Sequence, residues 1–242
     1  MKKFLFLAFF IGICAYFPSF ANAGDYSGVY IFPKFVYSYQ RIDSAELKID
    51  VAGLGSESSE LSDEKDSTFG GAFSIGYDFA PNFGRGIRTE LEYAIRSQSE
   101  GSYSNDYYYN GYLVKDSGSM KFDIQTIFLN IYFDFETGTP FTPYLGGGLG
   151  VAIIDAKGNL KETFDGDVVF DESESNTEEN FAFNFSAGLA YDMNDRFSLD
   201  LGYRYADFGE GETGNLGSDD FSIKGESRVI AHEVLLGLRY MY

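Results

Sequence analysis

Apolar and polar residues alternate along most of this chain, so that every second residue is apolar over long stretches. Side chains of a β-strand point alternately to opposite faces of the sheet, so a period of two predicts strands. Each stretch is long enough to cross a bilayer as a tilted strand of about 9–11 residues. The eight segments with this pattern are 28–41, 67–80, 86–97, 119–136, 142–156, 179–193, 196–209 and 226–242.

The two faces of these predicted strands differ in charge as well as in hydropathy. In the seventh segment, Leu199 and Leu201 alternate with Asp200 and Arg204, and the third and eighth segments repeat this arrangement. A soluble sandwich or lipocalin-like barrel would bury the apolar face, whereas a membrane barrel turns it toward lipid. Alternation alone leaves both open. Phe and Tyr near the strand ends favour the membrane barrel, because its outer surface carries aromatic girdles.

The connectors between the segments alternate in length. The long ones are polar and acidic and span 44–66, 98–118, 157–178 and 210–225, and the short ones are 81–86, 137–141 and 194–196. Outer-membrane barrels have an even number of antiparallel strands, short periplasmic turns and long extracellular loops. The predicted fold is therefore all-β: an eight-stranded antiparallel transmembrane β-barrel, an up-and-down meander with four long extracellular loops.

Glycines crowd the segment "PFTPYLGGGLGVAIID", residues 140–155, without the spacing of a phosphate-binding loop. Gly146, Gly148 and Gly150 stand at alternate positions, on the face opposite Leu145 and Leu149. We predict that this face lines the barrel lumen and leaves room for long charged side chains from other strands. Small residues recur on the second and sixth segments at Gly70, Ala72, Ser74, Gly76, Ala182, Ser186, Gly188 and Ala190.

The first 23 residues have the pattern of a secretory signal peptide. Lys2 and Lys3 precede an apolar run over 4–17, and small residues end at Ala23. The run is shorter than the roughly 20 residues of a membrane-spanning helix. We therefore predict a cleaved signal peptide over 1–23 and a barrel domain in the cell outer membrane over 24–242.

The charge of the chain excludes nucleic acid as a partner. The formal net charge is −19, and it falls to −21 when Lys2 and Lys3 leave with the signal peptide. Phosphate binding requires a basic surface.

Strand parity also places charged residues on the lumen side in equal numbers of each sign. An eight-stranded interior is only wide enough to be filled by side chains, so we expect these charges to pair and to plug the lumen. The predicted lumen charges are Lys34, Arg88, Glu90, Glu92, Arg96, Asp134, Asp200, Arg204, Glu233 and Arg239.

Four short motifs carry a resemblance to a known family. They are "NIYFDF" (130–135), "PYLGGGLGV" (143–151), "LGYRYADFG" (201–209) and "LGLRYMY" (236–242). In their order and spacing the chain resembles the opacity-type, OmpA-like outer-membrane β-barrel proteins over residues 24–242. The resemblance implies an eight-stranded surface protein, embedded in outer-membrane lipid and lipopolysaccharide and expected to be a monomer, whose loops meet the outside and whose ligand it does not name.

The last motif is similar to the terminal signal read by the outer-membrane assembly machinery. Its alternating residues are Leu236, Leu238, Tyr240 and Tyr242, with Tyr242 in place of the more usual Phe.

Some barrels of this kind are enzymes, so His232, the single histidine, is a candidate catalytic residue. A hydrolase would need it bonded to a serine and oriented by an acid, and Ser227 and Glu233 are nearest in sequence. Parity turns His232 outward and Glu233 inward, which favours an interfacial histidine over a lipid-modifying hydrolase. We predict no enzyme activity and no cofactor.

The long connectors hold the remaining candidates. Acidic residues over 44–66 and 157–178 would suit calcium, but they lack the ligand order of a calcium loop, so we expect solvated segments and no specific metal site. The segment 98–118 is rich in tyrosine among Ser, Asn and Gly, a composition typical of recognition surfaces; a strand extension above the membrane is the alternative. These tyrosines are Tyr103, Tyr107, Tyr108, Tyr109 and Tyr112.

Three functions are compatible with these observations. The favoured one is a non-enzymatic surface protein, structural or adhesive through its loops toward a host or cell-surface ligand. A narrow porin-like channel and an enzyme at the outer rim are the alternatives.

Overall fold

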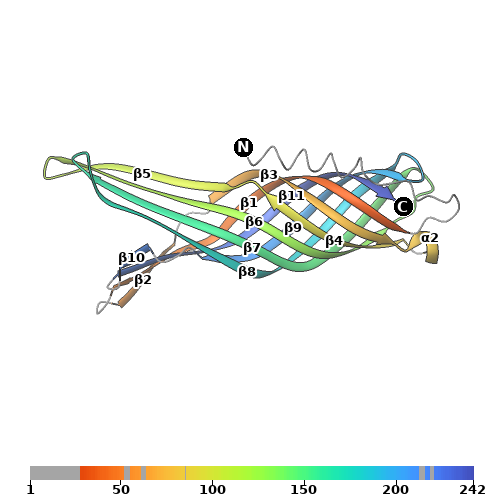
Figure 1. The fold of residues 1–242 in the computed structure, drawn as a ribbon, viewed down its shortest axis with the longest axis horizontal. Coiled ribbons are helices and arrows are strands. Elements are labelled where there is room, and N and C mark those ends of the chain that lie inside the picture. Colours follow the sequence, from red (N-terminus) through yellow and green to blue (C-terminus); the bar gives the residue numbers. More distant parts are fainter. Residues whose placement is uncertain (1–27, 52–54, 61–63, 85, 213–215, 219–220) are drawn as a thin grey trace.

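The structure is a computed structural model, and it describes residues 28–51, 55–60, 64–84, 86–212, 216–218 and 221–242. The predicted signal peptide, residues 1–23, lies outside the described residues. Figure 1 shows a closed barrel of tilted strands with two groups of strands projecting from one end.

Eight antiparallel strands form the barrel, which confirms the predicted fold. Each pairs with the next along the chain, and the last pairs with the first to close the ring. They are β1 (Val29–Val51), β3 (Glu64–Asp78), β4 (Ile87–Arg96), β6 (Tyr112–Asp134), β7 (Phe141–Phe164), β8 (Asp167–Asp192), β9 (Phe197–Glu212) and β11 (Phe221–Met241).

Three shorter strands lie outside the ring. β2 (Gly55–Glu60) pairs with β1, β5 (Ser99–Tyr109) with β6, and β10 (Leu216–Ser218) with β11. The single helix in the described part of the chain, α2 (Ala80–Phe83), forms the turn between β3 and β4. No described helix is long and apolar enough to cross a membrane.

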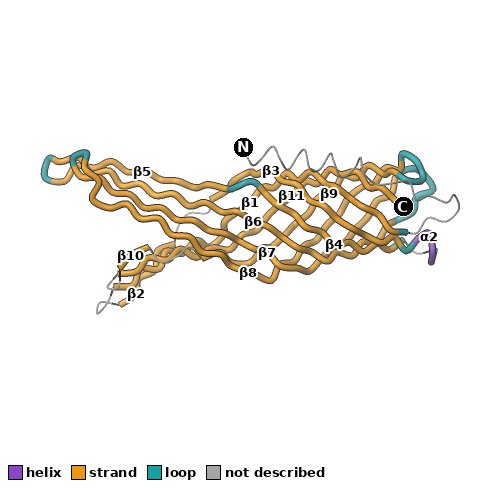
Figure 2. Tube along the Cα trace, in the orientation of Figure 1, coloured by secondary structure: helices purple, strands orange, loops and turns teal. Residues whose placement is uncertain are grey.

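The four long connectors are present, but the described residues form strands over much of their length, which for 98–118 is the strand extension given as the alternative. β7 has 24 residues and β8 has 26, so both continue far beyond the roughly ten that a membrane strand needs. Together with β5 and β6 they form a four-stranded antiparallel sheet that projects from the barrel (Figure 2). We call residues 99–121 and 157–181 the extracellular sheet.

Two tight turns end this sheet. Asn110 and Gly111 join β5 to β6, and Asp165 and Gly166 join β7 to β8, all four with positive φ. Such pairs are typical of two-residue hairpins, whose twist matches that of the flanking strands. The pairing therefore extends from the barrel to the tips, with one register shift between β7 and β8 at Glu162 and Thr163.

The outer surface of the barrel is apolar and the inner surface is mixed. Phe181, Phe185 and Leu129 are among the most exposed apolar side chains, while the alternating positions point inward and are buried. Aromatic rings meet near the short-turn end, where Phe141 contacts Tyr191 with ring centroids 5.0 Å apart. An apolar belt with an aromatic rim is the surface that a bilayer requires.

Candidate functional site

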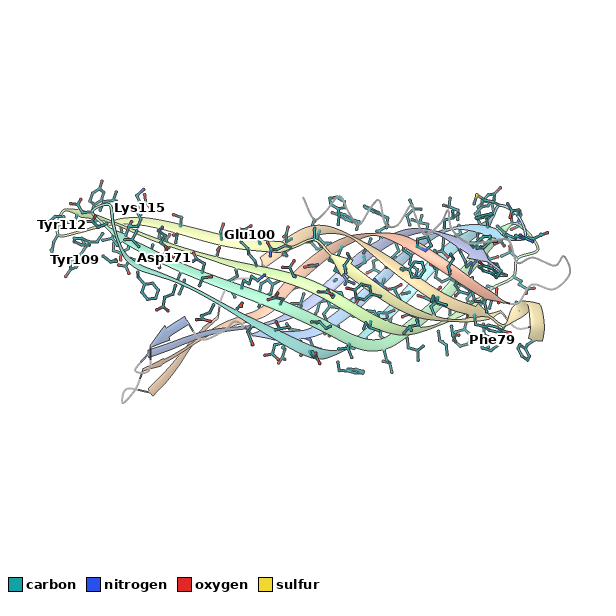
Figure 3. All side chains as sticks on the ribbon, viewed as in Figure 1. Phe79, Glu100, Tyr109, Tyr112, Lys115 and Asp171 are labelled. Carbon is teal, nitrogen blue, oxygen red and sulfur yellow. The ribbon has the colours of Figure 1, made fainter. Side chains whose placement is uncertain are left out.

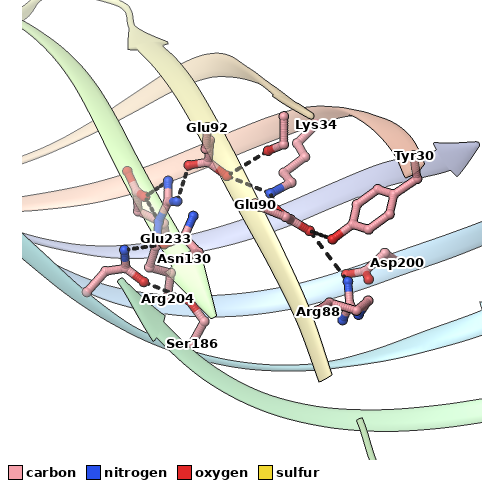
Figure 4. Close-up of polar contacts among 12 residues, drawn as sticks. Tyr30, Lys34, Arg88, Glu90, Glu92, Asn130, Ser186, Asp200, Arg204 and Glu233 are labelled. Carbon is pink, nitrogen blue, oxygen red and sulfur yellow. Dashed lines mark hydrogen bonds and ion pairs between the residues drawn. The ribbon is translucent and has the colours of Figure 1, made fainter. Parts of the chain in front are cut away.

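The structure places all ten predicted charges in the lumen, where they are buried or nearly so. Eight of them form ion pairs, drawn from five of the eight barrel strands. Figure 4 shows much of this network.

Lys34 of β1 is at one centre of the network. Its Nζ lies 2.7 Å from Glu90 Oε2 and 2.6 Å from Glu92 Oε2, both on β4. The hydroxyl of Tyr30 donates a hydrogen bond of 2.9 Å to Glu90 Oε1. Both carboxylates thus share one ammonium group and have further partners of their own.

Glu233 of β11 is at the second centre, between two arginines. Arg96 Nε lies 2.6 Å from Glu233 Oε1, and Arg204 Nη2 lies 2.6 Å from Glu233 Oε2. Arg204 also contacts Glu92, which joins the two centres. Arg88 extends the network toward the short-turn end, with its Nε 2.6 Å from Asp134 Oδ2.

Asp200 and Arg239 differ from the other eight, since neither forms an ion pair among the described residues. Asp200 accepts a hydrogen bond of 2.6 Å from the Tyr144 hydroxyl, and its Oδ2 has no partner. It lines an internal cavity of about 10 Å³, which is roughly the space of one water molecule. Arg239 Nε and Nη1 also have no partner, and Arg239 borders a vestibule of about 560 Å³ at the short-turn end.

An apolar layer lies next to the ion pairs on the extracellular side, and the sequence analysis missed it. The Arg96 guanidinium carbon lies 4.4 Å from the centroid of the Phe208 ring, where the layer meets the network. The buried residues of this layer are Phe122, Ile124, Phe128, Ala152, Ile154, Ala156, Ala182, Ala206, Phe208, Val229 and Ala231. Charged and apolar layers together fill the lumen.

The lumen glycines make room for rings and amides rather than for the long charged side chains that we expected. A Cβ on Gly146 would overlap the Tyr132 ring, and one on Gly148 would overlap the Asn130 amide. Gly188 lies in the same way beneath Tyr144. The charged side chains stack on these rings instead of on the glycines: the Arg88 guanidinium carbon lies 5.0 Å from the centroid of the Tyr132 ring.

His232 lies on the outer surface, as parity predicted. Its Nδ1 is 2.6 Å from the Tyr203 hydroxyl, and its ring centroid is 5.6 Å from that of Tyr205. Glu233 points inward to the two arginines, so it does not orient the imidazole. The side chain of Ser227 lies outside those that the structure describes.

Tyrosines gather at the tip of the extracellular sheet (Figure 3). Tyr107, Tyr108, Tyr109 and Tyr112 are all exposed, Tyr108 to 76%. The side chain of Tyr103 is not among those described. No set of three or more His, Cys, Asp or Glu residues in the described part of the chain is placed to hold a metal ion.

The terminal strand carries its predicted signal residues on the outer face. Leu236 and Leu238 are exposed toward the lipid belt. Tyr240 packs against Phe197 with ring centroids 5.0 Å apart and against Tyr242 at 5.4 Å.

Known proteins share both the sequence pattern and this architecture. Over 225 residues the chain is 25% identical to the outer membrane protein PagN of Salmonella typhimurium, covering 92% of this chain and 93% of that protein. A putative adhesin of Rickettsia conorii is 26% identical over 181 residues, covering 71% and 67%.

The crystal structure of the outer membrane protein OprG from Pseudomonas aeruginosa has the same fold. It is 16% identical with a TM-score of 0.51, and the match covers 90% of this chain and 98% of that one. A family model described as an outer membrane protein beta-barrel domain matches residues 20–240, so the chain belongs to this family of outer-membrane β-barrel proteins.

Proposed function

We propose that the protein is a non-enzymatic surface adhesin, which holds its ligand with the extracellular sheet while the barrel serves as a filled anchor. The observation that carries this proposal is the sheet itself, in which β5 pairs with β6 while β6, β7 and β8 continue directly from the barrel, and whose tip carries exposed tyrosines. Tyr side chains provide a large contact area at low entropic cost. The likeness to a putative adhesin supports the same conclusion.

The lumen favours this proposal over a channel. The vestibule at the short-turn end meets buried ion pairs, and an apolar layer follows them. Neither offers a continuous hydrated path to a solute.

The environment of His232 favours the proposal over an enzyme at the outer rim. The histidine is bonded to a tyrosine, and the adjacent acid is turned away from it. The residues that bond it among those described are therefore not a nucleophile and an orienting acid.

We also propose that the barrel contacts outer-membrane lipid, lipopolysaccharide and the outer-membrane assembly machinery. The apolar belt fits outer-membrane lipid and lipopolysaccharide, and the exposed alternation of Leu236 and Leu238 fits the assembly machinery. We propose a monomer, because β1 pairs with β11 and the barrel closes within a single chain.

Whole-cell binding with and without the sheet tests the proposal. The truncated variant shortens both hairpins, closing β5 to β6 after Gly101 and β7 to β8 after Lys157 with Asn-Gly turns. Its control is a variant of full length in which the tip tyrosines Tyr107 and Tyr109 are replaced by Phe.

We expect the truncated barrel to reach the outer membrane at normal levels and to lose attachment of the cells to host or neighbouring cells, while the Phe variant retains most of it. Normal attachment by the truncated variant would contradict the proposal.

A further inference from the structure

The charges of the extracellular sheet are sorted between its two faces. Residues 99–121 and 157–181 contain four lysines and no arginine, and all four lysines have the parity of the lipid-facing surface. We call this the outer face. Three of these lysines form ion pairs with the residue directly opposite: Lys115–Asp106 at 3.1 Å, Lys121–Glu100 at 3.2 Å and Lys161–Asp171 at 3.4 Å. The outer face is thus internally neutralised.

The other face, which has the parity of the lumen, holds acids without any basic residue. We call it the inner face. Asp116 of β6 lies directly opposite Glu162 of β7, and Glu172 and Glu174 follow on β8. Among the described residues, Glu162, Glu172 and Glu174 form no ion pair. A cationic ligand would therefore find the carboxylates of Glu162, Glu172 and Glu174 available to it.

Aromatic rings lie on the same inner face. Tyr107, Tyr109 and Tyr112 are exposed near the tip, and Phe170 lies directly opposite Glu162. A ring face next to a carboxylate binds a cationic side chain through both cation–π attraction and ion pairing. Anionic ligands would be repelled by the same carboxylates.

The spacing of the carboxylates fits an extended chain rather than a metal ion. Glu172 and Glu174 are two residues apart on one strand, or about 7 Å along it. Alternate side chains of an extended peptide have the same spacing. The described carboxylates do not converge as metal ligands.

We propose that the inner face of the extracellular sheet binds a Lys- or Arg-rich segment of a partner protein in extended conformation. This inference rests on the proposed function, because it names the class of ligand for the same sheet.

Peptide binding to the purified, detergent-solubilised protein tests it. The probe is a fluorescent peptide in which Lys alternates with Thr, compared by anisotropy with one in which Glu replaces Lys, with a chelator present throughout. The inner-face variant combines Glu162→Gln, Glu172→Gln and Glu174→Gln. Its matched control combines Glu100→Gln, Asp106→Asn and Asp171→Asn, which removes the same charge from the outer face.

We expect the Lys peptide to bind with an affinity that falls as salt rises, because exposed ion pairs are screened. The inner-face variant should bind about tenfold more weakly, and the outer-face variant within about twofold of the wild type. The gel shift of the folded barrel confirms that each variant is assembled.

Failure to bind the Lys peptide, equal binding of the Glu peptide, or an equal loss in both variants would overturn the inference. If truncation of the sheet abolishes attachment of cells while the Lys peptide does not bind, the adhesin proposal stands and the cationic ligand is excluded. Attachment that survives truncation contradicts the adhesin proposal itself.

Discussion

Three strands, β6, β7 and β8, run through both the barrel and the extracellular sheet, but the inner positions of the two regions differ in charge: charges of both signs pair in the lumen, and only acids occur in the sheet. In the lumen, Lys34 and Arg204 meet carboxylates of other strands across the barrel. In the sheet, the inner positions carry Glu162, Glu172 and Glu174 and no basic residue. Closure of the barrel lets most of the buried charges pair across the lumen, whereas we propose that the open sheet leaves its inner-face acids for a cationic ligand.

The largest expected effect follows from shortening β11, the strand that closes the barrel, at its C-terminal end. The amide of Tyr242 donates to Val29 O at 2.9 Å, and that of Met241 donates to Arg196 O at 2.9 Å. Deleting Met241 and Tyr242 should leave almost no folded protein in the outer membrane, because the closing strand loses its terminal pairs and its assembly signal. Immunoblots of membrane fractions measure this. Normal levels of the shortened chain would refute it.

The second-largest expected effect is the loss of stability when one charged side chain is removed from the lumen network. Arg204→Ala or Glu90→Ala leaves buried partners uncompensated, which costs about 3–5 kcal/mol in a dry site. The midpoint of unfolding in detergent or vesicles should fall accordingly. Leu201→Val, on the lipid-facing side, is the control and should cost about 1 kcal/mol or less. Similar losses in both would mean that water solvates the lumen.

Conductance measurements test whether side chains fill the lumen and block the passage of ions. Purified wild-type protein in a planar bilayer should carry little or no steady current, because side chains occupy the interior. Phe128→Ala combined with Phe208→Ala removes two rings from the apolar layer and should increase the current. Steady large channels from wild-type monomers would support the porin alternative.

Glycine-to-alanine substitutions, which add one methyl group, test whether inner positions of the barrel are packed more tightly than outer positions. Gly148→Ala would overlap the Asn130 amide inside the barrel and should cost about 1–3 kcal/mol. Gly71→Ala faces outward, where the nearest atom, Lys34 O, is 3.7 Å from the new Cβ. The second variant should unfold at the wild-type midpoint or slightly above it. Equal losses would show that backbone conformation, not lumen packing, decides the cost.

The smallest expected effect concerns the ion pairs on the outer face of the sheet. Lys115 and Asp106 are both about half exposed, at 53% and 51% of their side chains. Lys115→Ala should therefore change the free energy of unfolding by about 0.2–1 kcal/mol. The effect should vanish in high salt. A loss as large as that of Arg204→Ala would erase the distinction between the two regions.

Strand parity predicted the inner face and its charges, and the alternating connector lengths and aromatic strand ends were also needed to predict a membrane barrel. Period-two alternation placed Arg88, Glu92 and Glu233 on the inner face, and closure into eight strands brought them together. Parity does not give height along the barrel axis, however. It therefore could not show that Phe122 and Phe208 form a separate layer, or that Asp200 and Arg239 form no ion pair with the residues that the structure describes.

The extracellular sheet was predicted only in part, as the alternative of a strand extension for 98–118, because its strands are polar on both faces and no hydrophobic period distinguishes them from loops. Two signals were present. Asn110-Gly111 and Asp165-Gly166 are the dipeptides most typical of two-residue hairpins, and each lies midway along a predicted loop. The strands of the sheet form because backbone pairing continues outward from the barrel. This pairing depends on residues far apart in the sequence, so no local sequence pattern indicates it.

The filled interior also bears on how many copies a cell can display. A wide pore raises the permeability of the envelope with every molecule inserted, so its abundance trades surface coverage against leakage of toxic compounds. A barrel whose lumen is filled by the Glu233 network and the Phe208 layer would anchor the extracellular sheet in the membrane without raising the permeability of the envelope. If the protein is an adhesin, as we propose, dense surface coverage would strengthen attachment through many weak simultaneous contacts without a penalty in barrier function.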